Sequence, residues 1–254
     1  MSRMTGWEAA FLAAAGVVGG LTGSIAGLAS VATYPALLLV GLPPVTANMT
    51  NTVSLVFNAI GSVAGSRPEL ADQTRSLARL APAAALGGIL GAVLLLSTPA
   101  EGFEKSVPFL LGFAALAILL PRGEDKPHPR RRHPATALAE AAGVLVIAVY
   151  GGYFGAAAGV LLLALLLRTD DSAPLTHANA AKNLLLGTAN VVAAAVFVVV
   201  APVAWAAVVP LGLGCLVGSR LGPVVVRHAP PGPMRVAIGI AGLALAVRLA
   251  IDAF

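Results

Sequence analysis

The sequence predicts an all-helical polytopic membrane protein made of two inverted repeats, with about five helical segments in each repeat and ten segments in all. Three observations support this fold class. The 254 residues are 58% hydrophobic and 11% charged, and their mean hydropathy is +0.89, whereas soluble domains carry about 25% charged residues. A glycine motif occurs twice, and basic residues gather between long apolar runs. A soluble protein of this composition would expose large apolar patches.

The apolar runs set the order of the elements. A membrane-spanning helix needs about 20 apolar residues, and a loop rich in proline and arginine should not be helical. Such a loop divides the chain into a first transmembrane repeat at 1–121, a cytoplasmic basic linker at 122–134 and a second transmembrane repeat at 135–254. The runs cover residues 8–42, 45–65, 77–97, 105–121, 135–167, 174–200, 203–222 and 233–253.

The first run of each half is too long for a single crossing. Runs 8–42 and 135–167 would each be about 50 Å long as one helix. Both contain the motif GGxxGxxxG, at 19–27 and at 151–159. Because glycine permits sharp turns, we expect each run to form two short or discontinuous segments. The same offset of 132 residues superposes Asn51 on Asn183 and Asn58 on Asn190, as expected of a duplicated transporter unit.

The loop charges predict how the segments cross the membrane. Loops 66–80, 122–134 and 223–232 are flanked by or contain arginines, whereas loop 98–104 carries Glu101 and Glu104. The positive-inside rule places basic loops in the cytoplasm. All three basic loops lie there only if each long run crosses twice, which gives five crossings per half and inverts the second half. Eight crossings with parallel repeats is the alternative. The net charge of +5 then reports orientation and not nucleic-acid binding.

Two apolar runs carry matched polar stripes. At 100° per residue, the polar residues of each run fall within about one third of the helix circumference. Such stripes face the bundle interior or a water-filled cavity, so we expect them to line a substrate path, although they could also only join helices together. The stripes consist of Asn48, Asn51, Thr52 and Asn58 in the second run, and of Asn179, Lys182, Asn183 and Asn190 in the sixth.

Lys182 is the most informative polar residue. It lies about eight residues into its run, and no acidic residue stands three or four positions away. Because an ammonium inside the membrane needs a partner, we expect a bound anion to supply one. The alternative is that Lys182 reaches the interface from near the start of its helix.

The second glycine motif suggests a further contribution to anion binding. A broken helix exposes backbone N–H groups at the new N-terminus, where the helix dipole favours anions. We therefore expect Gly151, Gly152 and Gly155 to allow close approach of the backbone to the substrate. Tyr153 could donate its hydroxyl group to the substrate or anchor at the membrane interface. Packing of small residues between helices is the alternative for the glycines.

Several kinds of chemistry are not indicated by the sequence. The acidic residues all lie at the ends of the apolar runs or in loops, which argues against a metal-cation pump and an aspartyl intramembrane protease. The motifs HExxH and CxxC and the phosphate-binding loop do not occur. The single cysteine, Cys215, lies in an apolar run and is expected to be a packing residue. We predict no catalytic residue, no metal site and no cofactor.

The second half also resembles a known family. The segment 150–160 (YGGYFGAAAGV) is followed by 179–183 (NAAKN), Asn190, 203–205 (VAW) and 218–222 (GSRLG). These residues resemble the second half of the sulfite exporter TauE/SafE family of membrane permeases. The first half departs from the family pattern, because 27–35 (GLASVATYP) keeps the proline but loses most of the preceding glycines. The resemblance implies two repeated units and a plasma-membrane carrier for small sulfur-containing anions such as sulfite, sulfonates or sulfoacetate.

The sequence therefore predicts a secondary transporter, for export or uptake, that works by alternating access at a midplane site between two repeats. Its partners would be a small anionic substrate and the lipid bilayer of the cell (inner) membrane, and no nucleic acid. The coupling ion is left open between a proton and sodium, as is the oligomeric state. The alternatives are an anion channel that uses the same polar path, and a membrane scaffold or enzyme without transport.

Overall fold

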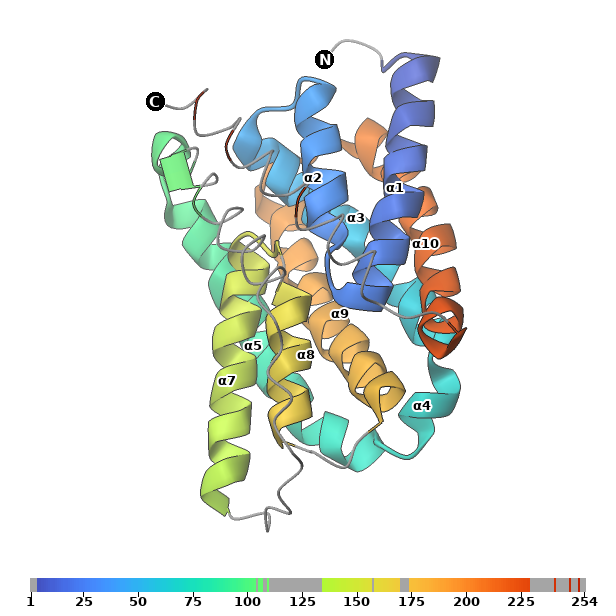
Figure 1. The fold of residues 1–254 in the computed structure, drawn as a ribbon. Coiled ribbons are helices and arrows are strands. Elements are labelled where there is room, and N and C mark those ends of the chain that lie inside the picture. Colours follow the sequence, from blue (N-terminus) through green and yellow to red (C-terminus); the bar gives the residue numbers. More distant parts are fainter. Residues whose placement is uncertain are drawn as a thin grey trace.

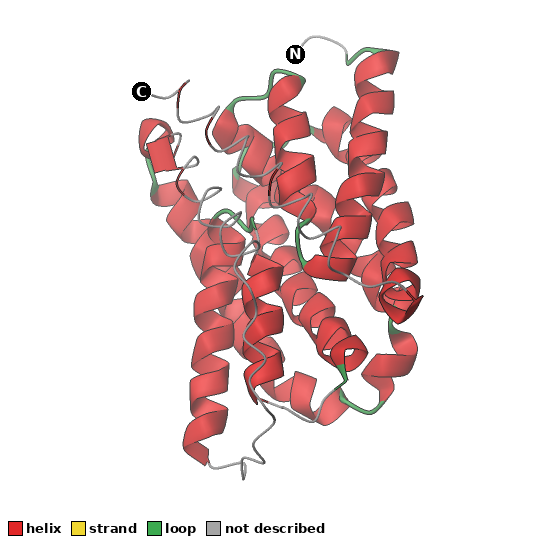
Figure 2. Cartoon of the chain, in the orientation of Figure 1, coloured by secondary structure: helices red, strands yellow, loops and turns green. Residues whose placement is uncertain are grey.

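The computed structural model describes residues 4–103, 105–106, 109, 134–156, 158–169, 174–228, 240, 247 and 251. Within these residues every regular element is a helix (Figures 1 and 2), in agreement with the predicted all-α class. The first half contains α1 (Gly6–Ala26), α2 (Ala29–Leu39), α3 (Pro44–Gly65), α4 (Arg67–Ala71) and α5 (Thr74–Ser97). The second contains α7 (Pro134–Tyr153), α8 (Ala158–Thr169), α9 (Leu175–Val200) and α10 (Trp205–His228).

Some predicted elements lie outside these residues. The fourth and eighth apolar runs, 105–121 and 233–253, are described at only a few positions each, and the basic linker is described only at Pro134. The predicted total of ten segments, the proposed domain boundaries and the inversion of the second half therefore stay predictions.

Five described helices are long and apolar enough to cross a membrane, namely α1, α5, α7, α9 and α10. Helix α3 has 22 residues, but its three asparagines and its threonines lower its hydropathy. Helices α2 and α8 have 11 and 12 residues and would be about 17–18 Å long, against a hydrocarbon core of about 30 Å. These two helices are therefore too short to span the bilayer alone.

Both long runs are broken in the way that the glycine motifs predict. Helix α1 ends at Ala26, and Gly27 adopts φ 76°. Its N–H group donates to the carbonyl of Gly23 at 2.7 Å. In the second half, Gly155 adopts φ 77° between α7 and α8. Because residues other than glycine are disfavoured at positive φ, glycine allows the chain to turn at both breaks.

The two halves exchange their main packing partners. Helix α1 packs chiefly along α10, and α7 packs chiefly along α5. Pairs of glycines allow both contacts, because added Cβ atoms would overlap the backbone of the facing helix. Gly214 and Gly218 of α10 face α1 at Ala13 and Val17, and Gly87 and Gly91 of α5 face α7 at Leu145 and Val149. The two contacted positions of α7 lie 132 residues after the two contacted positions of α1.

The long helices of the two halves run in different directions through the bundle (Figure 1). In Figure 1, α1 descends from the N-terminus, whereas α7 ascends from the lower end of the molecule. Likewise α5 ascends and α10 descends. These directions concern single helices, and the inversion of the second half as a whole stays a prediction.

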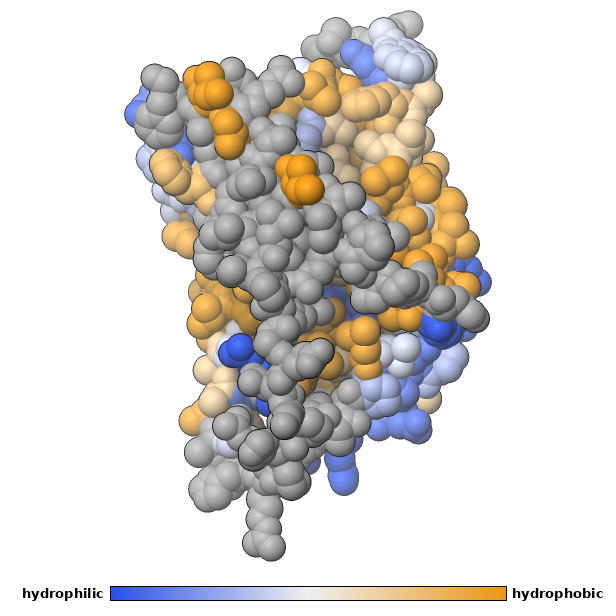
Figure 3. Space-filling model, in the orientation of Figure 1, coloured by the Kyte–Doolittle hydropathy of each residue, from blue (hydrophilic) through white to orange (hydrophobic). Residues whose placement is uncertain are grey.

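The outer surface is apolar over much of its area. Large apolar side chains are exposed along α5, α9 and α10, including Leu90, Leu94, Val199 and Leu213. Figure 3 shows hydrophobic residues along the right of the molecule, with hydrophilic residues above them at the upper right and below them at the lower right. An apolar surface of this extent is unfavourable in water, and it matches the surface of a multi-pass membrane protein.

Candidate functional site

A small cavity lies where the two helix breaks meet. Its volume open to water is about 20 Å³, which is enough for a single water molecule. Both halves of the chain contribute to its wall. The lining residues are Gly23, Gly27, Ala29, Ser30, Thr52, Leu55, Asn58 and Ala59 from the first half, and Gly151, Phe154, Gly155, Asn183, Leu186, Gly187 and Asn190 from the second.

Half of the site residues expected from the sequence line this cavity. They are Thr52, Asn58, Gly151, Gly155, Asn183 and Asn190. The other six, Asn48, Asn51, Gly152, Tyr153, Asn179 and Lys182, are not among the lining residues. The structure therefore brings the two polar stripes to the same place, but it turns part of each stripe toward neighbouring helices.

The cavity wall contains residues from equivalent positions of the two halves. Gly23 and Gly155, Leu55 and Gly187, and Asn58 and Asn190 are each separated by 132 residues, and all six line the cavity. Gly27 and Gly159 have the same separation. A Cβ atom added to either of them would overlap the main chain of the other. The cavity therefore lies at the centre of the pseudosymmetric arrangement.

Asn58 provides a polar group without a partner at this site. Its Oδ1 atom is buried and has no hydrogen-bond partner among the described residues. It lies 3.2 Å from the position that a Cβ atom of Gly23 would take. An unpaired buried amide oxygen is costly, so it calls for a partner such as a water molecule or a ligand in the cavity.

The start of α2 forms another part of the wall, and sequence analysis did not select it. Ala29 and Ser30 lie in the first turn of α2, which has no side-chain cap. The N-terminal end of a helix presents free N–H groups and a positive partial charge. Ser30 lies three residues after the last glycine of the first motif, so its position just after the break was the available signal.

Asn51 holds this helix start in place. Its Nδ2 atom donates to Ser30 Oγ at 3.1 Å, and its Oδ1 atom accepts from Thr33 Oγ1 at 2.6 Å. Asn51 is fully buried and connects α3 to two residues of α2. It therefore acts on the cavity by positioning Ser30, and not by lining the wall.

Lys182 lies behind the cavity wall, with no exposed surface. Its Nζ atom donates to the carbonyl oxygens of Gly23 at 3.1 Å and Ser24 at 3.2 Å, and to Asn179 Oδ1 at 2.8 Å. A position at the membrane interface, the alternative considered above, is therefore wrong for this side chain. The ammonium group is placed at the C-terminal end of α1, where the helix dipole favours a cation.

Three other predicted residues contact neighbouring residues and do not line the cavity. Asn48 Nδ2 donates to the carbonyl of Tyr153 at 2.7 Å. The ring of Tyr153 stacks edge-on against Phe103, with 5.7 Å between the ring centres. Gly152 faces α5, since an added Cβ atom would lie 2.5 Å from the carbonyl oxygen of Gly88. For Gly152 the packing alternative describes the observed contacts.

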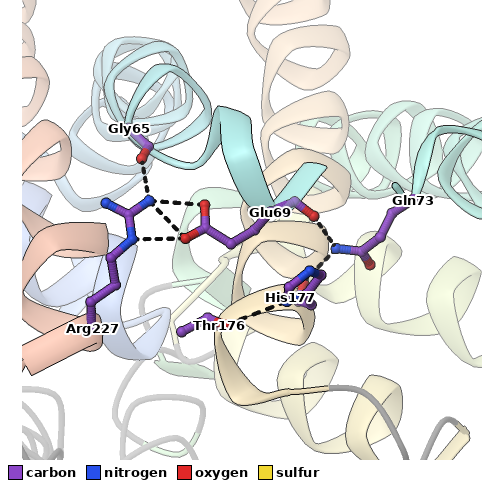
Figure 4. Close-up of polar contacts among 6 residues, drawn as sticks. All are labelled: Gly65, Glu69, Gln73, Thr176, His177 and Arg227. Atoms are coloured by element: carbon purple, nitrogen blue, oxygen red, sulfur yellow. Dashed lines mark hydrogen bonds and ion pairs between the residues drawn. The ribbon is translucent and has the colours of Figure 1, made fainter. Parts of the chain in front are cut away.

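A second polar contact joins the two halves away from the cavity (Figure 4). Arg227 of α10 donates from Nε to Glu69 Oε1 at 2.8 Å and from Nη2 to Glu69 Oε2 at 2.9 Å. Gln73 Nε2 donates to the carbonyls of Glu69 at 2.7 Å and of His177 at 3.1 Å. These bonds connect α4, α9 and α10 at one end of the bundle.

Comparison with known proteins agrees with this architecture. The family model described as "Sulfite exporter TauE/SafE" matches residues 12–249. The chain belongs to the TauE/SafE family. A relative from Sinorhizobium sp., named "Probable membrane transporter protein ORF9", is 28% identical over 244 residues, which cover 96% of this chain and 92% of the relative. "Probable membrane transporter protein YfcA" of Escherichia coli K12 is 27% identical over 241 residues, covering 93% and 87%.

A third relative, from Haemophilus influenzae, is named "Probable membrane transporter protein" and is 25% identical over 248 residues, covering 96% of this chain and 94% of the relative. The three relatives are named as probable membrane transporters, and the family is described as sulfite exporters. With the membrane-spanning helices described above, this establishes the chain as a multi-pass protein of a transporter family.

Proposed function

We propose that this TauE/SafE protein is a secondary transporter of small sulfur-containing anions, such as sulfite or organosulfonates, that works by alternating access. The observation that carries the proposal is the cavity at the meeting point of the two helix breaks, with Asn58 and Asn190 at equivalent positions of its wall. Membrane transporters built from inverted repeats bind their substrates at such a junction.

The chemistry of the wall favours an anion. The described lining residues include amides, a serine and the first turn of α2, and none of these described residues is a carboxylate. Asn58 can turn its Nδ2 group toward a ligand, because its Oδ1 atom has no described partner to lose. The ammonium group of Lys182 stands directly behind Gly23 and adds a positive potential in a medium of low dielectric constant, where charges act over longer distances.

The proposed role of Lys182 is therefore indirect. In the sequence-based hypothesis its ammonium group binds the anion itself, whereas in the structure the group donates to three oxygen atoms of the protein. We propose that Lys182 stabilises the bound anion from behind the wall and fixes the end of α1. Asn183, which lines the cavity and donates to the carbonyl of Ser24 at 3.2 Å, connects the two regions.

The size of the cavity requires a conformational change for transport. A volume of about 20 Å³ admits a water molecule and not an oxyanion with several heavy atoms. The two halves must therefore move apart to admit the substrate. Opposite helix directions in the two halves are consistent with rocking of one inverted repeat against the other. In this proposal the Arg227–Glu69 contact closes one end of the path.

Flux measurements on the purified protein in liposomes test this function. We expect saturable sulfite flux that is stimulated by the same anion on the opposite side, and weaker or no flux of carboxylates of similar size. Sulfate, thiosulfate, taurine and sulfoacetate define the range of sulfur anions. Flux that does not saturate and shows no countertransport would favour the anion channel, and no flux of any sulfur anion would refute the proposal.

Lys182→Ala provides a direct check of the electrostatic part. In sodium-free N-methylglucamine buffer, we expect this variant to insert into the membrane but to lose most sulfite flux, because the cavity loses its nearby positive charge. Protease accessibility of the membrane-inserted protein separates loss of function from loss of insertion. Sulfite flux at the wild-type rate would show that Lys182 has no part in transport.

A further inference from the structure

The C-terminal end of α1 forms a cage of oxygen atoms around the ammonium group of Lys182. Two main-chain carbonyls, those of Gly23 and Ser24, and the side-chain carbonyl of Asn179 lie 2.8–3.2 Å from Nζ. The carbonyl of Ser24 also accepts from Asn179 Nδ2 at 2.9 Å and from Asn183 Nδ2 at 3.2 Å. Lys182 and Asn179 are almost fully buried.

These oxygens lie at the C-terminal end of α1, where Gly27 turns the chain away. The carbonyl of Gly23 accepts from the N–H group of Gly27 at 2.7 Å and has a second lone pair for the ammonium group, while the carbonyl of Ser24 accepts from side chains of α9. Neutral carbonyl oxygens at the end of a broken helix are the groups that hold sodium in other transporters with discontinuous helices. The cage therefore has the oxygen ligands of a monovalent-cation site, and the ammonium group of Lys182 lies among them.

We propose that this cage is a monovalent-cation site that the protein fills permanently with the side chain of Lys182. A covalently attached ammonium group supplies the positive charge that a free sodium ion would otherwise supply behind the cavity wall. The first half carries Thr50 at the equivalent position, where its Oγ1 atom accepts from the N–H group of Ala204 at 3.1 Å. The built-in cation thus belongs to the second half only.

The inference follows from the geometry of the cage and does not require that the proposed transport function be correct. Its test is a binding measurement, so that its failure and a failure of sulfite flux are separate results. Removing the lysine side chain by Lys182→Ala leaves the oxygen atoms in place and makes room for an ion. We expect sodium to bind in that variant and to raise its thermal stability by mass action.

The experiment compares unfolding temperatures of the purified full-length protein in detergent, in sodium chloride and in N-methylglucamine chloride of equal ionic strength. We expect the wild-type temperature to be the same in both salts. We expect Lys182→Ala to unfold at a lower temperature, and saturating sodium to raise that temperature by about 5 °C. Lys182→Thr, which introduces the residue found at position 50, is the second variant in case the alanine variant does not fold.

Two controls make the response specific. Lys182→Met fills the space with an apolar chain of similar length and is expected to show no sodium response. Asn179→Ala combined with Lys182→Ala removes one oxygen of the cage, and the sodium response should fall at least tenfold in apparent affinity. The proposal is overturned if sodium stabilises the wild type, if neither Lys182→Ala nor Lys182→Thr responds to sodium, or if Lys182→Met responds equally.

Discussion

Replacement of Gly27 by alanine tests the close contact between the two helix breaks. Gly27 adopts φ 76°, and an added Cβ atom would overlap the main chain of Gly159. An L-residue in the left-handed region costs about 1–2 kcal/mol, and overpacking of a filled interior costs about 1–3 kcal/mol. Because the obstructing atoms belong to the backbone, they cannot rotate away. We therefore expect Gly27→Ala to lower the free energy of unfolding by about 2–5 kcal/mol.

The chain offers a matched control for this prediction. Gly41 adopts φ 85°, but a Cβ atom there would have no atom within 4 Å. Gly41→Ala should therefore carry only the backbone cost of about 1–2 kcal/mol. Gly159→Ala tests the overlap alone, because Gly159 is helical and the same two residues collide.

Thermal unfolding of the three variants in detergent, followed by loss of the monodisperse peak in size-exclusion chromatography, measures the difference. At about 2–4 °C per kcal/mol, the overlap cost of about 1–3 kcal/mol should make Gly27→Ala unfold about 2–12 °C below Gly41→Ala. Equal unfolding temperatures for Gly27→Ala and Gly41→Ala would mean that the two breaks do not touch.

Three further predictions concern the polar groups. Asn190→Ala should reduce sulfite flux at least tenfold, whereas Thr188→Ala, which changes a residue of the same helix outside the cavity wall, should leave it near the wild-type rate. Asn51→Ala removes the hydrogen bonds that hold the start of α2. It should reduce sulfite flux and lower the free energy of unfolding by about 1–3 kcal/mol. Unchanged flux in that variant would dismiss the positioning role of Asn51. Glu69→Gln weakens the contact between Glu69, which is 11% exposed, and Arg227, which is 32% exposed. The change should lower the free energy of unfolding by about 1–2 kcal/mol and speed hydrogen exchange in α4. Unchanged exchange would argue against a closing contact.

The sequence could predict the helix breaks because the signal is local. A glycine motif inside an apolar run that is too long for one helix leaves few other solutions, and both Gly27 and Gly155 take the predicted kind of conformation. The polar positions Asn58 and Asn190 could be predicted for a related reason. An amide in an apolar helix is costly unless it faces a polar space, so its presence predicts a polar partner or a cavity at that position.

The orientation of each polar stripe could not be predicted to the same detail. A stripe that covers one third of a helix is wide enough to face two neighbours at once. In α9 this stripe contacts both the cavity, through Asn183 and Asn190, and the end of α1, through Asn179 and Lys182. Which neighbour lies on which side depends on long-range packing, and the spacing of residues along one helix contains no information about it.

Apolar and small lining residues were missed for a different reason. Leu55, Phe154 and Gly187 line the cavity, but in sequence they look like any other residues of an apolar run. Gly152 shows the reverse error, because it is adjacent to a lining glycine and yet faces α5. Neighbouring residues of a helix differ by 100° in direction, so a glycine-rich segment cannot reveal which of its members faces a cavity.

The contact between Gly27 and Gly159 also limits how the duplicated halves can diverge. Elsewhere the two copies have drifted apart, as Ala47 and Thr50 stand where the second copy has Asn179 and Lys182. At this crossing neither Gly27 nor Gly159 can carry a side chain, because a Cβ atom added to either glycine would overlap the main chain of the other. Glycine is therefore required at both positions of this crossing, whereas the residues at 47 and 50 differ from those at 179 and 182.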